Sequence, residues 1–247
     1  MPKKKSISED NFLSVIACPR YLSLNYNPYE LDQSQLIALT ALKYFYKNVN
    51  KLYEGLNIDN LINISVTRAI GPKLKNELDA YKKSIKLYSY TFIYDFIKKY
   101  PLEEWSPVLI DMKVPFETSQ YTIYFNYDFI LKNLKNKKLS VITFFHRSDK
   151  QIESNLHYFE SKAAYIHDKI YLALGSAEIQ HSLFYLPRYK HSAVKKRDTF
   201  LFIDLIIEPT NNILFYINLF NDKVLIERNP FCLNYSCKVR KYCYDNK

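Results

Sequence analysis

The chain has 247 residues, a formal net charge of +10, and 48% hydrophobic and 16% aromatic residues. This composition supplies enough apolar material for one large core, and no linker-like stretch divides it, so we expect one domain over residues 1–247. The chain has only three glycines, which excludes the glycine-rich phosphate loops of ATPases and dinucleotide-dependent enzymes. No apolar run is long enough to cross a bilayer and no secretory signal follows the first lysines, so the sequence predicts a cytoplasmic protein without a membrane partner.

The first part of the chain, about residues 8–99, has the periodicity of helices. The pattern predicts helices over residues 8–24, 33–54 and 73–99, and Ser8 is placed to cap the first of them. These segments are amphipathic, and the last is rich in Lys and Tyr. We therefore expect a helical part that packs one face against the rest of the domain.

The pattern changes after Pro101 to extended runs of β-branched and aromatic residues, and we expect a sheet core over about residues 105–220. A three-strand meander is predicted over 108–116, 121–131 and 139–145. A helix is predicted over 151–174, strands over 200–207 and 213–219, and a short helix over 222–228. This order favours an α/β fold with a mixed central sheet flanked by helices.

Four cysteines have the spacing of metal ligands: Cys18, and then Cys232, Cys237 and Cys243 in the tail, residues 229–247. In a reducing compartment, thiolates on a metal are more plausible than disulfides. Four thiolates suit both tetrahedral zinc and an iron–sulfur cluster, so the ligand count leaves the choice open. A cluster with these ligands would join the two ends of the domain.

The positive charge favours a polyanionic partner, for which nucleic acid is the commonest candidate, although a lysine-rich solvated surface is the alternative. Tyr185 and Tyr189 are candidates to stack on unpaired bases. The candidate contacts to nucleic acid are Lys132, Lys135, Lys137, Lys138, Arg188, Lys190, Lys195, Lys196, Arg197, Lys238, Arg240 and Lys241.

The chain resembles the RecB-like branch of the PD-(D/E)XK nuclease superfamily, which includes CRISPR-associated RecB-like exonucleases and AddB-type nuclease domains. The resemblance rests on the order of elements and on three motifs: Ser6-Ile7-Ser8, Cys18-Pro19-Arg20-Tyr21, and the ending from Asn229-Pro230-Phe231-Cys232 to Cys243. It implies a restriction-endonuclease-like core and a [4Fe–4S] cluster on the four cysteines. The four-residue gap between Cys232 and Cys237, often two in the family, keeps zinc as the alternative.

In the family, an acidic residue on one strand and an acid and a lysine on the next hold Mg²⁺ or Mn²⁺ and activate water. The resemblance places Asp128 at the first position but Thr143 and Phe145 at the other two. Family members also present Gln-x3-Tyr from the following helix and often a His from an upstream helix. Here these correspond to Ser161 and Tyr165, and to Tyr44 or Tyr46. This implies a degenerate active site and no Mg²⁺ or Mn²⁺ cofactor.

Two other arrangements of the site are open. Asp111-Met112-Lys113 has the right residue types but precedes Asp128 by one strand, and we interpret it as a charge pair on an edge strand. His146 with Asp128 would form an unusual site with a single carboxylate.

The sequence is compatible with three functions. The first is a catalytically degenerate protein that binds DNA, single-stranded or with ends, or a larger DNA-processing or transcription complex. The second is an active metal-dependent DNA exonuclease with non-standard residues. The third is a scaffold or regulatory subunit that contacts protein and not DNA.

Overall fold

The computed structural model describes residues 5–11, 18, 31–71, 74, 77–117, 121–146, 179–186 and 190–194. The predicted helix over 151–174, the predicted strands over 200–207 and 213–219, and the cysteine tail lie outside these residues. Within them the chain has a mixed α/β architecture, as the sequence predicted. No helix in this described part is long and apolar enough to cross a membrane.

Three α-helices form one layer: α3 (Gln33–Lys47), α4 (Ile58–Ile70) and α5 (Asp79–Lys99), with a short 3-10 helix η1 (Val49–Leu52) between the first two. The start of α3 is fixed by a capping box, in which the Asp32 carboxylate accepts from the Gln35 amide and the Gln35 side chain accepts from the Asp32 amide. The predicted helix over 33–54 is thus confirmed in part, because α3 ends at Lys47. The third predicted helix begins six residues later than expected, at Asp79 and not at residue 73.

The sequence analysis missed α4 entirely. Its residues include several β-branched and Asn side chains, which have low helix propensity. The helix forms because Asn57 caps its start and because Leu61, Ile62 and Val66 are buried against α3 and α5. Tertiary packing therefore decided a segment whose local preference was weak.

One sheet contains all the described strands: β1 (Lys5–Ser8), β2 (Trp105–Glu117), β3 (Tyr121–Asn133), β4 (Leu139–His146), β5 (Ile179–Leu186) and β6 (Lys190–Val194). The meander β2–β3–β4 is antiparallel, as predicted, and the pairs β1–β3 and β4–β5 are parallel, which makes the sheet mixed. The prediction of helix from Ser8 was wrong at its first residue, which ends β1, although the Ser8 hydroxyl still accepts a capping bond from the Asn11 amide. The hairpin β5–β6 was not predicted.

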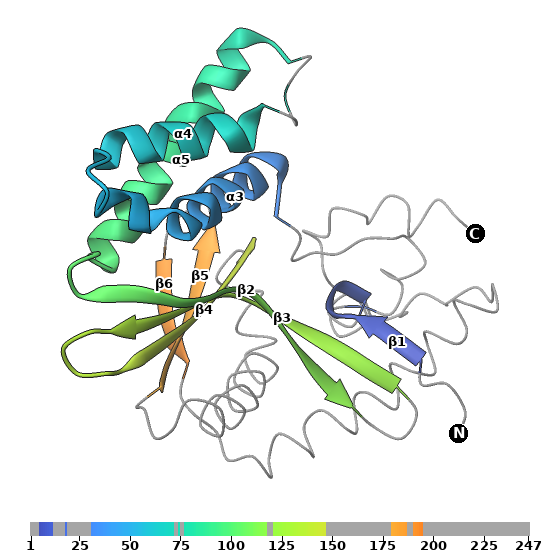
Figure 1. Cartoon of the computed structure of the whole chain (residues 1–247). Helices are drawn as coiled ribbons and strands as arrows, with labels where there is room; N and C mark the ends of the chain where they lie inside the picture. The colour runs from blue at the N-terminus through green and yellow to red at the C-terminus, as the bar shows by residue number, and fades with distance from the viewer. Residues whose placement is uncertain are drawn as a thin grey trace, which may run out of the picture.

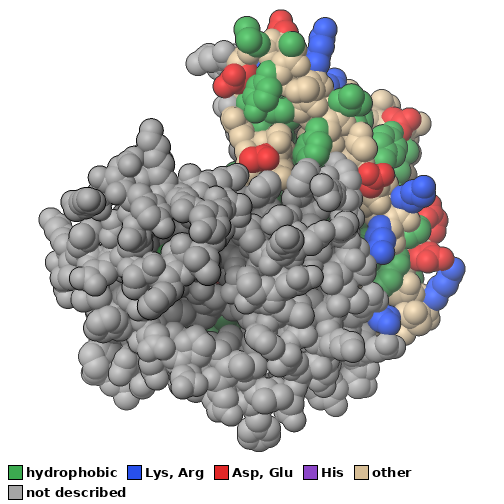
Figure 2. Space-filling model, turned by 180° about the vertical axis from the view of Figure 1, so that it is seen from behind, with side chains coloured by type: hydrophobic (Ala, Val, Ile, Leu, Met, Phe, Trp, Pro, Cys, Tyr) green, Lys and Arg blue, Asp and Glu red, His purple; other side chains and the backbone are tan. Residues whose placement is uncertain are grey.

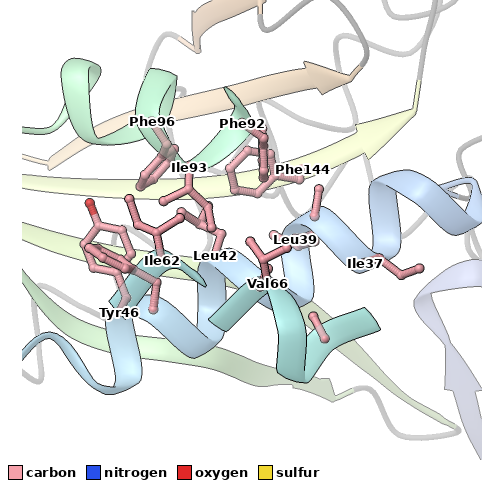
Figure 3. Packing of buried hydrophobic residues seen from close by; sticks show 14 of the residues in the cluster. Ile37, Leu39, Leu42, Tyr46, Ile62, Val66, Phe92, Ile93, Phe96 and Phe144 are labelled. Carbon is pink, nitrogen blue, oxygen red and sulfur yellow. The ribbon is translucent and has the colours of Figure 1, made fainter. Parts of the chain in front are cut away.

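The helices cover one face of the sheet (Figure 1). Aromatic rings fill the space between the layers: the Phe96 ring centroid lies 5.6 Å from that of Tyr46, 5.5 Å from that of Phe129 and 5.8 Å from that of Phe144. Figure 3 shows Phe96 and Phe144 in one cluster with side chains of α3 and α4, among them Leu42 and Ile62. This core fixes α3 above the middle of β3.

The strand β3 has an unusual set of neighbours. On one side it pairs with β2 along most of its length. On the other side, residues 121–124 pair with β1 and residues 129–132 pair with β4. Residues 125–128 lie between these two ladders, and we call this gap between β1 and β4 the fork.

Candidate functional site

Two carboxylates accept hydrogen bonds from backbone amides at the fork. The buried Glu9 carboxylate accepts a hydrogen bond of 2.6 Å from the Asn126 amide, and the Asp128 carboxylate accepts one of 2.7 Å from the Phe144 amide. Backbone amides that lose their strand partner need another acceptor when they are shielded from water. The carboxylates of Glu9 and Asp128 therefore take part in backbone hydrogen bonding at the fork.

Asp111 on β2 lies opposite Asp128 on β3. The register brackets the pair, because Ile110 lies opposite Phe129 and Met112 opposite Tyr127. Asp111 has a φ of 60°, in the left-handed region that costs energy for residues other than glycine but that Asp tolerates better than most. A further irregularity of β2 lies just before it, between Pro107 and Leu109.

The Lys43 ammonium on α3 lies between these two carboxylates. Its Nζ is 2.5 Å from Asp111 Oδ1 and 2.7 Å from Asp128 Oδ1. Lys47, one helical turn later, adds a contact of 3.0 Å to Asp111 Oδ2. The side chains of Lys43 and Asp128 are 19% and 15% exposed, whereas that of Asp111 is 46% exposed. We call Lys43, Asp111 and Asp128 the ion triad.

The protonation states follow from these contacts. Burial lowers the pKa of Lys43, but the attraction of Asp128 and the hydrogen bonds to both carboxylates outweigh it, so the pKa is raised overall. Burial raises the pKa of Asp111, but the hydrogen bonds from Lys43 and Lys47 outweigh it, so that pKa is lowered overall. At neutral pH Lys43 is therefore a cation and Asp111 an anion.

The triad has a clear electrostatic logic. Two carboxylates directly opposite each other on neighbouring strands repel, and the pair needs a cation between them. Here a protein ammonium supplies it from the helical layer. The arrangement gives the site the groups of a cation-binding centre, with the cation position filled by a side chain.

The structure changes the sequence-based interpretation of this site in two ways. We expected Asp111 to pair with Lys113. Instead, its carboxylate pairs with the ammonium groups of Lys43 and Lys47 on α3. The helix presents neither Tyr44 nor Tyr46 to the carboxylates. Tyr44 lies under the Arg68 guanidinium, and Tyr46 is buried in the core, where its hydroxyl has no hydrogen-bond partner among the described residues.

Lys43 was missed altogether. The signal available in the sequence was the spacing of Lys43 and Lys47, which are four apart and off the apolar stripe of their helix. That spacing shows a basic edge of the helix but not which strand faces it.

Other predicted site residues lie beside the triad or beyond the described residues. Continuing the β3–β4 register by one pair puts the half-buried Thr143 opposite Asp128. Phe145 and His146 belong to β4, but their side chains are not among those described. Ser161 and Tyr165 lie outside the described residues.

The cysteine site remains a prediction. Cys18 is described and is half-buried, whereas Cys232, Cys237 and Cys243 lie outside the described residues. Within the part of the chain that the structure describes, no group of three or more His, Cys, Asp or Glu side chains is arranged to hold a metal ion.

The β3–β4 hairpin carries four of the predicted contacts to nucleic acid. The buried Asn133 side chain accepts from the Lys135 and Asn136 amides and so shapes the turn. Lys135 is 2.7 Å from Glu104, and the Lys137 ammonium donates to the Leu134 carbonyl at 2.9 Å. Lys132 is exposed, and Lys138 is half-buried. The hairpin is therefore basic, but two of its lysines, Lys135 and Lys137, already contact other groups of the protein.

The other predicted basic residues fall differently. Tyr185 and Lys190 lie on β5 and β6, opposite each other in the hairpin. Of the remainder, the following lie outside the described residues: Arg188, Tyr189, Lys195, Lys196, Arg197, Lys238, Arg240 and Lys241.

No family model matches the chain, and no curated protein matches it. Among solved structures it is similar to the crystal structure of SSO0001, with 13% identity, a TM-score of 0.32, and 88% of this chain and 79% of that chain covered. It is also similar to protein VC1899 from Vibrio cholerae, with 11% identity, a TM-score of 0.24, and coverage of 86% and 55%. Likenesses at this level support no conclusion about fold or function.

Removing the Lys43 ammonium is expected to destabilise the protein. Lys43→Met leaves Asp128, which is mostly buried, facing Asp111 without the bridging cation, and we expect a loss of about 2–3 kcal/mol in the free energy of unfolding at pH 7. Because the pKa of Lys43 is higher in the folded than in the unfolded state, its ion pairs stabilise the fold fully below the unfolded-state pKa of lysine, about 10. This stabilisation is lost as the pH rises through the pKa of Lys43 in the folded state. Because the pKa of Asp111 is lower in the folded state, this carboxylate stabilises the fold above about pH 4, and the stabilisation is lost as the pH falls through the pKa of Asp111 in the folded state.

Urea unfolding of the wild type and of Lys43→Met, at pH values from below about 4 to above about 10, measures the difference in their free energies of unfolding. This difference should be largest between about pH 4 and about pH 10 and should shrink at more acidic and more basic pH. Lys47→Met is the matched control, because its ammonium is 52% exposed and contacts one carboxylate only, and we expect it to cost less than about 1 kcal/mol. Equal losses for the two variants would contradict the assignment of Lys43 as the bridging cation.

Proposed function

We propose that this chain is a RecB-like, PD-(D/E)XK-type protein that has lost metal-dependent cleavage and binds DNA or a DNA-processing complex. The observation that supports the loss of cleavage is the ion triad. Nucleases of this type need a divalent cation between acidic side chains, since the cation polarises the phosphate and lowers the pKa of the attacking water. In this chain Lys43 Nζ occupies the space between Asp111 and Asp128.

A lysine ammonium does not perform that chemistry. It carries one charge and no open coordination position, so it neutralises the carboxylates without binding a water for attack. A divalent cation would have to displace an ammonium held by two carboxylates. Thr143, opposite Asp128 in the continued register, adds no charge that would help the cation compete.

An active nuclease is the second candidate, and the same triad supports it. Two carboxylates and one lysine are the groups that a PD-(D/E)XK centre uses, even though the lysine here comes from α3 and not from a strand. If the Lys43 side chain moved aside when a divalent cation arrived, it would lie beside the bound metal. The two candidates differ in whether the wild-type protein binds Mn²⁺ at Asp111 and Asp128.

Cleavage and metal binding are expected to separate these candidates. We expect full-length wild-type protein to leave linear and single-stranded DNA intact with Mg²⁺ or Mn²⁺, and to show no calorimetric Mn²⁺ binding that depends on Asp128. In Lys43→Ala the two carboxylates are freed, so millimolar Mn²⁺ should recover part of the lost thermal stability by binding the native state. Lys43→Ala/Asp128→Asn is the control, and it should show no recovery.

Cleavage by the wild-type protein that is lost in Asp128→Asn would refute the proposal and favour the active nuclease. Cleavage that Lys43→Ala abolishes as well would assign the ammonium to the reaction.

The DNA-binding part of the proposal is supported by the net charge of +10 and by the basic β3–β4 hairpin. On this hairpin Lys132 is exposed and has no carboxylate partner among the described residues, while the buried Asn133 holds the turn in shape. Phosphate contacts from such lysines release counterions, so binding should weaken steeply with salt. A rigid basic turn suits contact with a phosphate backbone better than base recognition.

Charge reversal on the hairpin tests this interface. In fluorescence anisotropy with a single-stranded DNA, Lys132→Glu/Lys137→Glu should weaken binding about tenfold at low salt and lower the salt slope by about one to two. Lys83→Glu, on the distant part of α5, is a control with the same type of charge change and should leave the slope unchanged. No binding of the wild type even at low salt would instead favour a protein scaffold.

The proposal includes a [4Fe–4S] cluster on Cys18, Cys232, Cys237 and Cys243, supported by the spacing of the four cysteines in the sequence. Thiolate-bound iron–sulfur clusters absorb in the visible range, whereas zinc thiolates do not. Protein purified anaerobically should be brown with a broad band near about 400 nm, and Cys237→Ser should lose most of that band. A colourless protein with one equivalent of zinc would replace the cluster by a zinc site.

A further inference from the structure

A cation–π pair joins α3 to α4. The Arg68 guanidinium carbon lies over the Tyr44 ring, 4.7 Å from the ring centroid, and Tyr44 is half-buried whereas Arg68 is exposed. The described ion pairs of the helical layer involve Lys43, Lys47 and Lys82, and none of them involves Arg68. Among the described residues, Arg68 is therefore a planar cation that lies on an aromatic ring and has no carboxylate partner. We call Arg68 and Tyr44 the stacked pair.

The stacked pair lies beside the ion triad, because both use the same turn of α3. Tyr44 follows directly after Lys43, and successive residues of an α-helix lie about 100° apart around its axis. The Lys43 side chain contacts the carboxylates of β2 and β3, whereas the Tyr44 side chain meets Arg68 of α4. Lys47, three residues after Tyr44, lies between these two directions and is 52% exposed. A ligand on the stacked pair would therefore lie next to the helix turn that carries the bridging cation.

Few acidic side chains of these two helices compete for Arg68. The helix α3 contains no Asp or Glu, and α4 contains one, Asp59. Asp59 lies on the opposite side of α4 from Arg68, where it accepts a hydrogen bond from Tyr94 of α5. The exposed Glu54 and the cap residue Asp32 lie outside both helices. Seen from behind, by contrast, the helical part of the molecule shows Asp and Glu side chains interspersed with Lys and Arg (Figure 2). The junction of α3 and α4 therefore presents a cation without an acidic neighbour from the described part of either helix.

We propose that an unpaired base of single-stranded DNA stacks on the Arg68 guanidinium, whose other face is supported by the Tyr44 ring. Guanidinium planes and aromatic rings are the groups on which proteins stack unpaired bases. Tyr44 is a positioning residue, because it holds the guanidinium in place before the base arrives and so lowers the ordering cost of binding. The exposed Lys51, four residues after Lys47, adds a charge for the phosphates of the same strand. This inference rests on the proposed DNA binding, and it adds the form of DNA that is bound.

Two other ligands would use Arg68 in a different way. Duplex DNA keeps its bases stacked inside the double helix and would offer Arg68 a phosphate. An acidic protein partner would offer it a carboxylate. Both contacts depend mainly on the charge of Arg68, which lysine also supplies, and not on a guanidinium supported by a ring. Replacement of Arg68 by lysine therefore separates base stacking from these alternatives.

Binding of three DNA probes to the full-length protein tests the proposal by fluorescence anisotropy. With a single strand of about 20 nucleotides, Arg68→Lys and Tyr44→Leu should each lower the affinity at least about fivefold. The salt slope of Arg68→Lys should equal that of the wild type, because the charge is kept. Both variants should bind a duplex of the same length, and a strand of the same length built from abasic nucleotides, as tightly as the wild type does. The double variant should lose less than the two single losses combined, because the two side chains act as one unit.

Tyr53→Leu is the matched control, because it removes a tyrosine that is 82% exposed but outside the stacked pair, and its affinity should equal that of the wild type. Urea unfolding checks that the variants are folded, and Arg68→Lys keeps the test decisive if Tyr44→Leu disturbs the helices. Unchanged binding of the single strand by both variants, when the wild type binds it, overturns this inference and leaves the proposed DNA binding intact. An equal loss with the duplex or the abasic strand also overturns it, since Arg68 would then act without a base. No binding by the wild type even at low salt overturns the proposed DNA binding and this inference together.

Discussion

The Lys43 ammonium is the interaction on which the candidate site depends. It joins the helical layer to the sheet at the fork, where β3 lies between its described ladders with β1 and β4, and it separates two carboxylates that would otherwise repel. A cation in this position is needed for Asp111 and Asp128 to face each other in a partly buried setting. Here the protein supplies that cation from its own chain.

The aromatic core places this cation. Phe96, Phe129 and Phe144 fill the space below α3 and α5, and the face of α3 that packs on them sets the direction of its remaining side chains. Lys43 follows directly after the buried Leu42, on the edge of α3 toward β2 and β3. The chemistry of the site is thus a consequence of helix rotation, which packing fixes.

The fork gives a second constraint. Glu9 and Asp128 accept hydrogen bonds from the backbone amides of Asn126 and Phe144, so each has a structural role besides any chemical one. An Asp128 variant therefore perturbs the end of β4 as well as the charge of the triad.

The sequence by itself determined the class of the fold and the meander, because alternation of apolar residues marks strands wherever they lie in space. It also singled out Asp128, which the structure places in the ion triad. It did not identify α4, whose residues have weak helix propensity, or β1 and the hairpin β5–β6, whose strands are short and need partners distant in the chain. Lys43 and Asp111 are 68 residues apart in number and meet only when α3 is rotated by its core and β2 is placed beside β3. Tertiary structure alone decided the ion triad, since local pattern records which residues are charged but not which charges are neighbours.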